Sequence, residues 1–171
     1  GFGCSRSSFK AITTENCGTA GFITSAGADD NDFENCTALG GGVGQYGFRI
    51  RSADNRLSLA KASGYTAAGI STDTGGLRTK IVAPKMVGPG GATAVGIDIN
   101  AADCSVVTGS LTTNNRGLVT TGARTKCSAV DSYSNVDAGF LAALGADDSS
   151  FIDCSARSNG TRGIHLRSDR C

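Results

Sequence analysis

The residues with the clearest potential for chemistry are charged and polar side chains that alternate with apolar ones in short segments led by glycine. Gly47-Phe48-Arg49-Ile50-Arg51 and Gly96-Ile97-Asp98-Ile99-Asn100 show the pattern most plainly. Alternation with a period of two is typical of a β-strand, because successive side chains of a strand point to opposite faces. If the apolar residues face inward, the polar residues share the outer face.

These segments predict one polar strip on the outside of the protein. Its expected members are Arg49, Arg51, Asp73, Asp98 and Asn100. Guanidinium, amide and carboxylate groups offer fixed hydrogen-bond donors and acceptors, which suit the hydroxyl and carboxylate groups of sugars. We therefore expect a carbohydrate-binding strip. A row of charges that only keeps the sheet soluble accounts for the same residues equally well.

The weak candidates for acid–base catalysis are Asp73, Asp98 and His165, and they do not form a recognisable catalytic set. His165 is the single histidine of the chain. A histidine that acts as a general base needs a carboxylate to orient it, whereas its own strand offers only Arg162 and Arg167. We therefore expect a surface histidine. Whether the protein is an enzyme stays open at this point, with a non-catalytic role favoured.

Two acidic turns could attract a metal ion. One contains Asp29, Asp30 and Asp32, and the other contains Asp147 and Asp148. Clustered carboxylates can hold Ca²⁺, although solvated turns are the commoner explanation. Zinc is not expected, because the chain has one histidine and no Cys-x-x-Cys motif. We therefore expect no metal site and no cofactor, with Ca²⁺ at an acidic turn as the alternative.

The segments that carry these residues belong to a repeat. A glycine followed by a large apolar residue recurs at Gly21, Gly47, Gly69, Gly96, Gly117, Gly139 and Gly163. Helical repeats need a 3.6-residue periodicity that is missing, and so many glycines would weaken them. The frame of a leucine-rich repeat is missing as well. We therefore predict an all-β fold, a parallel β-helix of about seven rungs of roughly 22–24 residues, in which each unit covers its neighbour.

A second repeated frame contains cysteine. Phe33-Glu34-Asn35-Cys36-Thr37-Ala38 matches Phe151-Ile152-Asp153-Cys154-Ser155-Ala156, and shorter echoes surround Cys17, Cys104 and Cys127. We expect these five cysteines to occupy the same position in different rungs and to form an inward column of free thiols. Stacked parallel strands hold their Cβ atoms badly for the torsion of a disulfide.

The chain as a whole limits the expected partners. Its 171 residues suffice for one domain, residues 1–171, and its formal net charge of +1 gives no reason to expect nucleic acid. No apolar run is long enough for a transmembrane helix, so membrane insertion is not expected. Val119 and Leu141 are expected to be adjacent exposed apolar residues, which predicts a homotrimer or packing against another chain. The terminal units look uncapped, so we expect a segment of a longer chain.

The frame of Asn or Asp, then Cys, Ser or Thr and Ala, followed by Asn-Gly and Gly-Ile, resembles the pectin-lyase-like superfamily of right-handed parallel β-helices over residues 16–171. The resemblance implies a right-handed coil. It leaves the function open, because the superfamily includes polysaccharide lyases, glycosidases, uronate epimerases, and phage tailspikes and tail fibres.

Two functions follow from the resemblance. The first is a structural or receptor-binding module of a phage tail fibre or tailspike-like assembly, extracellular or virion-associated, that contacts surface polysaccharide. The alternative is a polysaccharide lyase or glycosidase, in which the strip around Arg51, Asp73 and Asp98 binds an acidic sugar. Elimination from a uronate needs a base near C5 and a group that neutralises the carboxylate, which Arg and a cation could supply.

Overall fold

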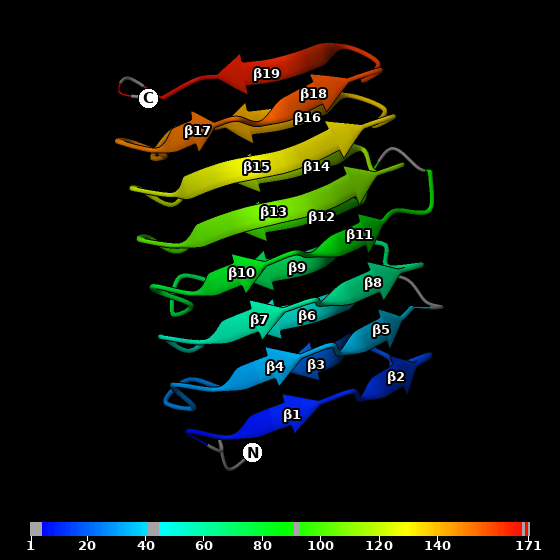
Figure 1. The fold of residues 1–171 in the computed structure, drawn as a ribbon, viewed down its shortest axis with the longest axis vertical. Helices are drawn as coiled ribbons and strands as arrows, with labels where there is room; N and C mark the ends of the chain where they lie inside the picture. Colours follow the sequence, from blue (N-terminus) through cyan, green and yellow to red (C-terminus); the bar gives the residue numbers. More distant parts are fainter. Residues whose placement is uncertain (1–4, 41–44, 91–92, 169, 171) are drawn as a thin grey trace.

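The computed structural model describes residues 5–40, 45–90, 93–168 and 170. Within these ranges every regular element is a β-strand, and neighbouring strands of each sheet are parallel. The strands at the front of Figure 1 run from left to right, and those behind run back while the chain climbs from the N-terminus to the C-terminus. This winding is right-handed. It confirms the predicted all-β, right-handed parallel β-helix.

Each turn of the coil has three strand positions, which stack along the axis into two sheets. The first position holds β1 (Ser8–Lys10), β4 (Asp32–Glu34), β7 (Arg56–Ser58), β10 (Lys80–Val82), β13 (Ser105–Thr112), β15 (Lys126–Tyr133) and β17 (Ser150–Ile152). The second position holds β2 (Thr13–Glu15), β5 (Thr37–Leu39), β8 (Lys61–Ser63), β11 (Lys85–Val87) and β18 (Ser155–Arg157), with the later halves of β13 and β15. These two positions form a 12-stranded sheet.

The third position forms a separate seven-stranded sheet. Its members are β3 (Ala20–Ile23), β6 (Tyr46–Ile50), β9 (Ala68–Thr72), β12 (Val95–Ile99), β14 (Arg116–Thr120), β16 (Ala138–Ala142) and β19 (Arg162–Leu166). The described residues contain no helix long and apolar enough to cross a membrane.

The interior is filled by columns of like residues, one from each turn. The register aligns Phe9 with Phe33 in the first position, and Phe22 with Phe48 and Ile70 in the third. Phe9 and Phe33 stack with 5.0 Å between ring centroids, and Phe22 and Phe48 with 4.7 Å. The inward side chains of each turn therefore cover those of the next turn. A repeat unit this short needs such stacking, because it cannot bury its apolar side chains alone.

The glycine of each Gly-apolar pair lies where the seven-stranded sheet comes close to the second strand position. A Cβ built at Gly47 would lie 2.5 Å from Cβ of Ala62 and 2.5 Å from the carbonyl oxygen of Gly69. The crowding recurs at Gly69, where a Cβ would lie 2.7 Å from the carbonyl oxygen of Gly96. Only a residue without Cβ permits this approach. The sequence repeat is therefore set by a steric requirement of the coil.

Residues with positive φ turn the corners between strands, and many are not glycine. Before the first strand they are Arg6, Asp30, Asp54, Arg78, Asp103, Arg124 and Asp148. Between the first and second strands they are Ala11, Asn35, Leu59, Ala83, Thr108, Ala129 and Asp153. Left-handed backbone costs a non-glycine residue roughly 1–2 kcal/mol. The hydrogen-bonded strands on either side must impose this conformation.

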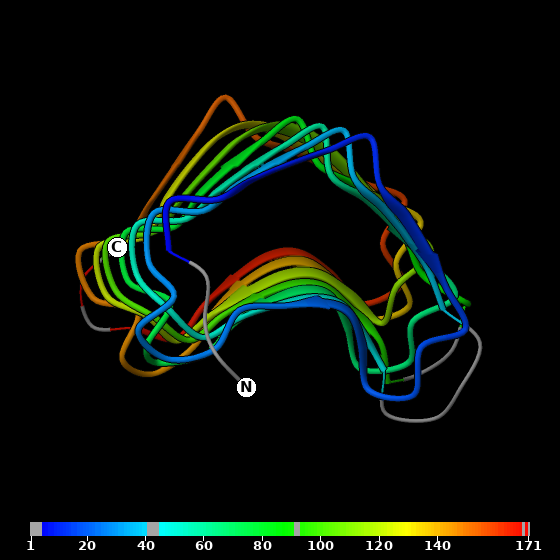
Figure 2. The same cartoon turned by 90° about the horizontal axis from the view of Figure 1, so that it is seen from below.

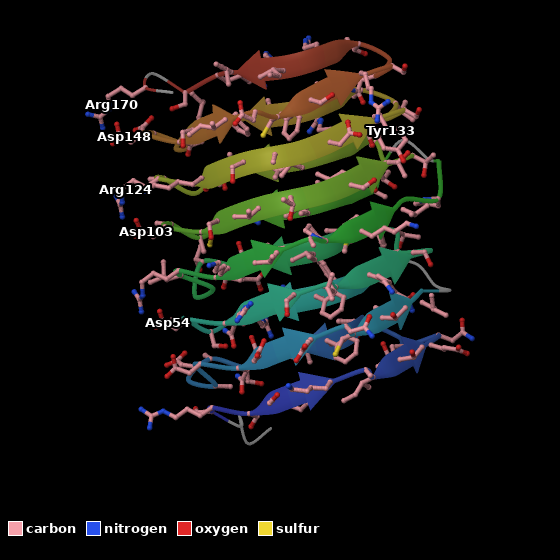
Figure 3. The ribbon with its side chains drawn as sticks, viewed as in Figure 1. Asp54, Asp103, Arg124, Tyr133, Asp148 and Arg170 are labelled. Carbon is pink, nitrogen blue, oxygen red and sulfur yellow. The ribbon has the colours of Figure 1, made fainter. Side chains whose placement is uncertain are left out.

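The corner before the first strand carries ion pairs from one turn to the next. Asp54 accepts hydrogen bonds of 2.7 and 2.6 Å from Arg78, and Asp103 accepts hydrogen bonds of 2.6 and 2.8 Å from Arg124. Figure 3 shows Asp54, Asp103 and Arg124 along one edge of the coil. Hydrogen bonding to these guanidinium groups lowers the pKa of Asp54 and of Asp103. The pairs are exposed, so they contribute little to stability.

The prediction of a single cysteine column is wrong. The register runs from Phe33 through Val106 and Cys127 to Phe151, so Cys127 occupies the position of a phenylalanine. Cys36 follows Phe33 by three residues, as Cys154 follows Phe151, so these two cysteines do share a position. The turns differ in length, because Phe33 lies 24 residues after its partner Phe9 whereas Cys127 lies 21 residues after Val106. Similar cysteine-containing sequence motifs therefore lie at different positions within their turns of the coil.

The two remaining cysteines of the expected column lie elsewhere as well. Cys104 comes directly before the first strand of its turn, and Cys17 follows the second. The expectation of free thiols is confirmed for the described cysteines, and Cys36, Cys104 and Cys127 are buried. Burial raises the pKa of the Cys104 thiol, so this group stays protonated near neutral pH.

Candidate functional site

The outer face of the seven-stranded sheet carries the residues of the predicted polar strip. The sheet is bowed toward the interior, so this outer face is concave (Figure 2). One column of outward positions, with one residue from each turn, is Ile23, Arg49, Ser71, Asp98, Val119, Leu141 and His165. Arg49, Ser71 and Asp98 are therefore consecutive along the axis.

Asp73 organises one side of the strip. Its Oδ2 accepts hydrogen bonds from Nε of Arg49 at 3.0 Å and from Nε of Arg51 at 3.1 Å, and its Oδ1 lies 3.4 Å from Oγ of Ser71. Arg49 also lies over the ring of Tyr46, with 4.9 Å between Cζ and the ring centroid. The side chain of Arg51 keeps 45% of its surface exposed, against 24% for Arg49. Arg51 is therefore the cation of the strip that is most open to an anionic ligand.

Asp98 lies on β12 and is half-buried although it faces outward. Burial raises the pKa of its carboxyl group, a hydrogen bond of 3.1 Å from Nδ2 of Asn100 lowers it, and the charge of Asp73 raises it further. The net direction is upward. A carboxyl group whose pKa is raised by burial at an outer face is a candidate for general acid–base catalysis.

A surface pocket of about 410 Å³ opens beside the strip. Its lining consists of Ser25, Ala26, Arg51, Asp73, Thr74 and Gly75. The Arg51–Asp73 pair is the part of the lining that the pocket shares with the strip. The volume lies within the range of small-molecule sites, so a ligand on the concave face could place one polar group in this pocket.

His165 shares a column with Asp98 but lies three strands farther along the axis, on β19. Desolvation lowers its pKa most, and Arg162 and Arg167 lower it further. The carboxylate that opposes this effect belongs to Asp137. The structure therefore brings two of the three catalytic candidates, Asp73 and Asp98, together and leaves His165 apart.

The predicted exposure of Val119 and Leu141 is wrong. Both residues occupy outward positions, as expected from the alternation, but Val119 is 8% exposed and Leu141 is 5% exposed. The concavity of the sheet explains this result, because side chains that project into a hollow converge and cover one another. Exposed apolar surface at these residues therefore no longer supports a trimer, which stays a prediction without this support.

Each acidic turn has at least one carboxylate that is paired with an arginine. Asp30 lies 3.7 Å from Arg6, and Asp148 lies 3.5 Å from Arg170. Among the described residues, no group of three or more His, Cys, Asp and Glu side chains is arranged to hold a metal ion. Binding of Ca²⁺ at these turns stays a prediction.

Tyr46 is a member of the concave face that was not predicted from the sequence. Alternation predicts that Tyr46 and Phe48 face the same way, but the inward space at Gly47 interrupts the alternation. Gly47 and Phe48 both face inward, which leaves Tyr46 outside, beneath Arg49. The recurring Gly-apolar pairs could have indicated this arrangement. A glycine that repeats directly before an inward residue indicates that its own position faces inward as well, so the residue before the glycine faces outward.

The raised pKa of Asp98 predicts a pH-dependent effect on stability. Folding favours the protonated carboxyl, so its contribution to stability is fully present below the pKa of the unfolded chain and is lost as the pH rises through the folded pKa. Asp98→Asn removes this loss. The free energy of unfolding of the variant, relative to that of the parent, should therefore be higher at about pH 7 than at about pH 3.5. Urea unfolding at both pH values measures it, and a difference that does not change with pH contradicts the raised pKa.

Comparison with known proteins bears on the architecture. No protein-family model matches the chain, and no curated protein matches its sequence. Among solved structures, the chain is similar to the A-module of the mannuronan C-5 epimerase AlgE4 from Azotobacter vinelandii, with a TM-score of 0.67 and 14% sequence identity. The match covers 96% of this chain and 57% of that one. At this identity the similarity shows the shared parallel β-helix fold alone.

Proposed function

We propose that the concave face binds an acidic polysaccharide and that the protein modifies this polymer by proton transfer at a carbon next to a carboxylate. The observation that carries the proposal is the register of three successive strands, which gathers Arg49, Arg51, Asp73 and Asp98 on one concave face. A solved module with the same fold is named as an epimerase that acts at C-5 of mannuronan. Its name supports a uronate polymer as the substrate class.

Arg51 and Asp98 have complementary roles in this proposal. Arg51 binds the carboxylate of one sugar unit at the rim of the pocket, which stabilises the charge that develops when the neighbouring C5 loses its proton. Ionised Asp98 accepts the C5 proton as the general base. The electron pair of the C–H bond moves into the carboxylate. Delivery of a proton from water to the opposite face of C5 gives epimerisation and leaves the original proton on Asp98. Departure of the O4 substituent, with water protonating the leaving oxygen, instead gives elimination with a C4–C5 double bond.

A second candidate function is the non-catalytic module of the tail-fibre or tailspike type, which would hold a polysaccharide without changing it. One observation favours it. Asp73 is engaged by Arg49 and Arg51, and His165 lies three strands from Asp98, so no second acid–base group stands beside Asp98 in the described part of the face. Assembly as a trimer, a virion and an extracellular location belong to this second proposal.

Incubation of the full chain with polymannuronate and polygalacturonate in D₂O distinguishes the two functions. We expect deuterium at C5, detected by NMR, or ultraviolet absorbance from unsaturated uronates. Binding without either signal supports the non-catalytic module. A neutral polymer such as dextran serves as the control and should show neither binding nor reaction. Failure to bind either uronate polymer contradicts the proposed modification of an acidic polysaccharide.

A further inference from the structure

The outer face of the 12-stranded sheet carries a second charged surface, which the proposed reaction does not use. Lys80 pairs in register with Arg56, and Lys85 pairs in register with Lys61. All four side chains are exposed and alternate with buried residues of the same strands. We call these four residues the basic patch. Their strands β7, β8, β10 and β11 lie at the front of the coil in Figure 1, and the concave sheet lies behind them.

The basic patch differs from most of the described surface because none of its four cations forms a salt bridge, although Arg56 faces Asp32 in register on β4. Lysine and arginine side chains elsewhere are mostly matched to an acid one turn away, as Lys10 is to Glu34 at 2.8 Å on the same sheet. The cations without an ion pair in the described ranges are Arg56, Lys61, Lys80, Lys85, Lys126 and Arg167. Four of these six form the basic patch, so the unmatched positive charge is concentrated there.

The pairing of Lys61 with Lys85 in the basic patch opposes folding rather than supporting it. Neighbouring strands lie about 4.8 Å apart, and like charges directly opposite one another on paired strands are destabilising. Lys61 has only a weak neutral contact, 3.5 Å from Nζ to Oδ1 of Asn35. An anionic ligand with several charges would remove this repulsion. The patch therefore has the electrostatic character of a binding surface.

The surroundings of the patch indicate what kind of polyanion fits. A surface pocket of about 210 Å³ has Lys61 and Lys85 in its lining, together with the apolar Leu39 and Val87. Leu59, which is 49% exposed and has positive φ, lies at the corner between Arg56 and Lys61. Sugar rings offer apolar C–H surfaces beside their anionic groups. Single-stranded nucleic acid instead favours aromatic platforms, and this patch has none.

We propose that the basic patch is an anchoring site for an acidic polysaccharide, separate from the concave face, with the polymer lying along the axis of the coil. The direction follows from the stacking of the cations along that axis. The proposal rests on the proposed function for the class of ligand. A long polymer held by the patch would stay near the protein after a segment leaves the concave face.

The double variant Lys61→Gln/Lys85→Gln tests the anchoring site. Binding of polygalacturonate at low salt should weaken about tenfold, and the salt dependence of binding should become shallower, because fewer counterions are released. The control Lys10→Gln removes a cation of the same sheet that Glu34 already neutralises at 2.8 Å, and it should change binding less than about twofold. The midpoint of thermal unfolding should be unchanged or higher in the double variant. Unchanged polymer binding overturns the proposal.

A uronate trisaccharide separates this proposal from the proposed function, because a short ligand occupies one site at a time. Arg51→Gln should weaken a trisaccharide bound at the concave face, and the double variant should leave its binding there unchanged. Loss of trisaccharide binding in the double variant overturns the assignment of a separate site. Tighter binding of duplex DNA or of phosphatidylserine vesicles than of polygalacturonate, at the same salt concentration, overturns the choice of ligand.

Discussion

Replacement of Gly47 by alanine is expected to lower the free energy of unfolding by about 3 kcal/mol or more. The new Cβ would lie 2.5 Å from Cβ of Ala62 and 2.5 Å from the carbonyl oxygen of Gly69. Neither group has a rotamer that moves it aside, because one is an alanine methyl and the other belongs to the backbone of β9. Relief therefore requires a shift of a whole strand. Chemical denaturation followed by circular dichroism measures the loss.

Gly18→Ala is the matched control for this experiment. A Cβ at Gly18 would have no atom within 4 Å. Substitution there should leave the free energy of unfolding unchanged or raise it by about 0.5 kcal/mol, because alanine restricts the unfolded chain. If Gly47→Ala and Gly18→Ala change the free energy of unfolding by the same amount, the seven-stranded sheet does not approach β8 as closely as described.

Asp98→Asn is expected to lower the turnover of an acidic polysaccharide by about 10²- to 10⁴-fold. Asparagine has nearly the same size and can still interact with Asn100, but it has no basic oxygen that could accept a proton from carbon. Binding of the polymer should persist, because Arg51 and the basic patch remain. The rate of deuterium incorporation at C5, or of unsaturated product formation, measures the effect.

Asp54→Asn supplies the control for the catalytic prediction. Asp54 is exposed, paired with Arg78, and lies on a corner rather than on the concave face. The same chemical change should leave turnover within about twofold of the parent, because it touches no part of the concave face. Turnover by Asp98→Asn within the same range would show that Asp98 is not the base, even if the protein remains active.

The two proposed surfaces differ in how their charges are arranged. On the concave face Asp73 holds Arg49 and Arg51 in fixed positions, which suits a site that must orient one sugar unit. On the basic patch the cations are exposed and form no salt bridge in the described part of the chain. Such a surface attracts a polyanion without fixing its register. The arrangement on the concave face suits a reaction on one sugar unit, and the arrangement on the basic patch suits retention of a long polymer.

Much of the architecture could be predicted from the sequence because its causes are local and repeated. The inward position before Phe48 admits only glycine. The same position recurs in each turn, so each turn can be recognised in the sequence by a Gly-apolar pair. The alternation after each pair then identifies the outward residues, and Arg49, Asp98 and His165 do share one outward column. The grouping of Arg51 with Asp73 followed from the same reasoning.

The corners and the cysteines could not be placed in this way. Leu59, Ala83 and Ala129 turn corners with positive φ, although nothing about these residue types signals a turn. The conformation is imposed by the strands that flank each corner. Without visible corners the length of each turn is unknown, so Cys127 could not be distinguished by position from Cys36 and Cys154.

By itself the sequence determined the repeat, the strand period and the outward identity of Asp98 and Arg51, because these depend on steric limits and on side-chain alternation within one turn. Only the tertiary structure decided which outward residues are exposed. The inward bow of the seven-stranded sheet buries Val119 and Leu141 and raises the pKa of Asp98. Exposure and acidity depend on the curvature of many stacked strands, a property that no single turn contains.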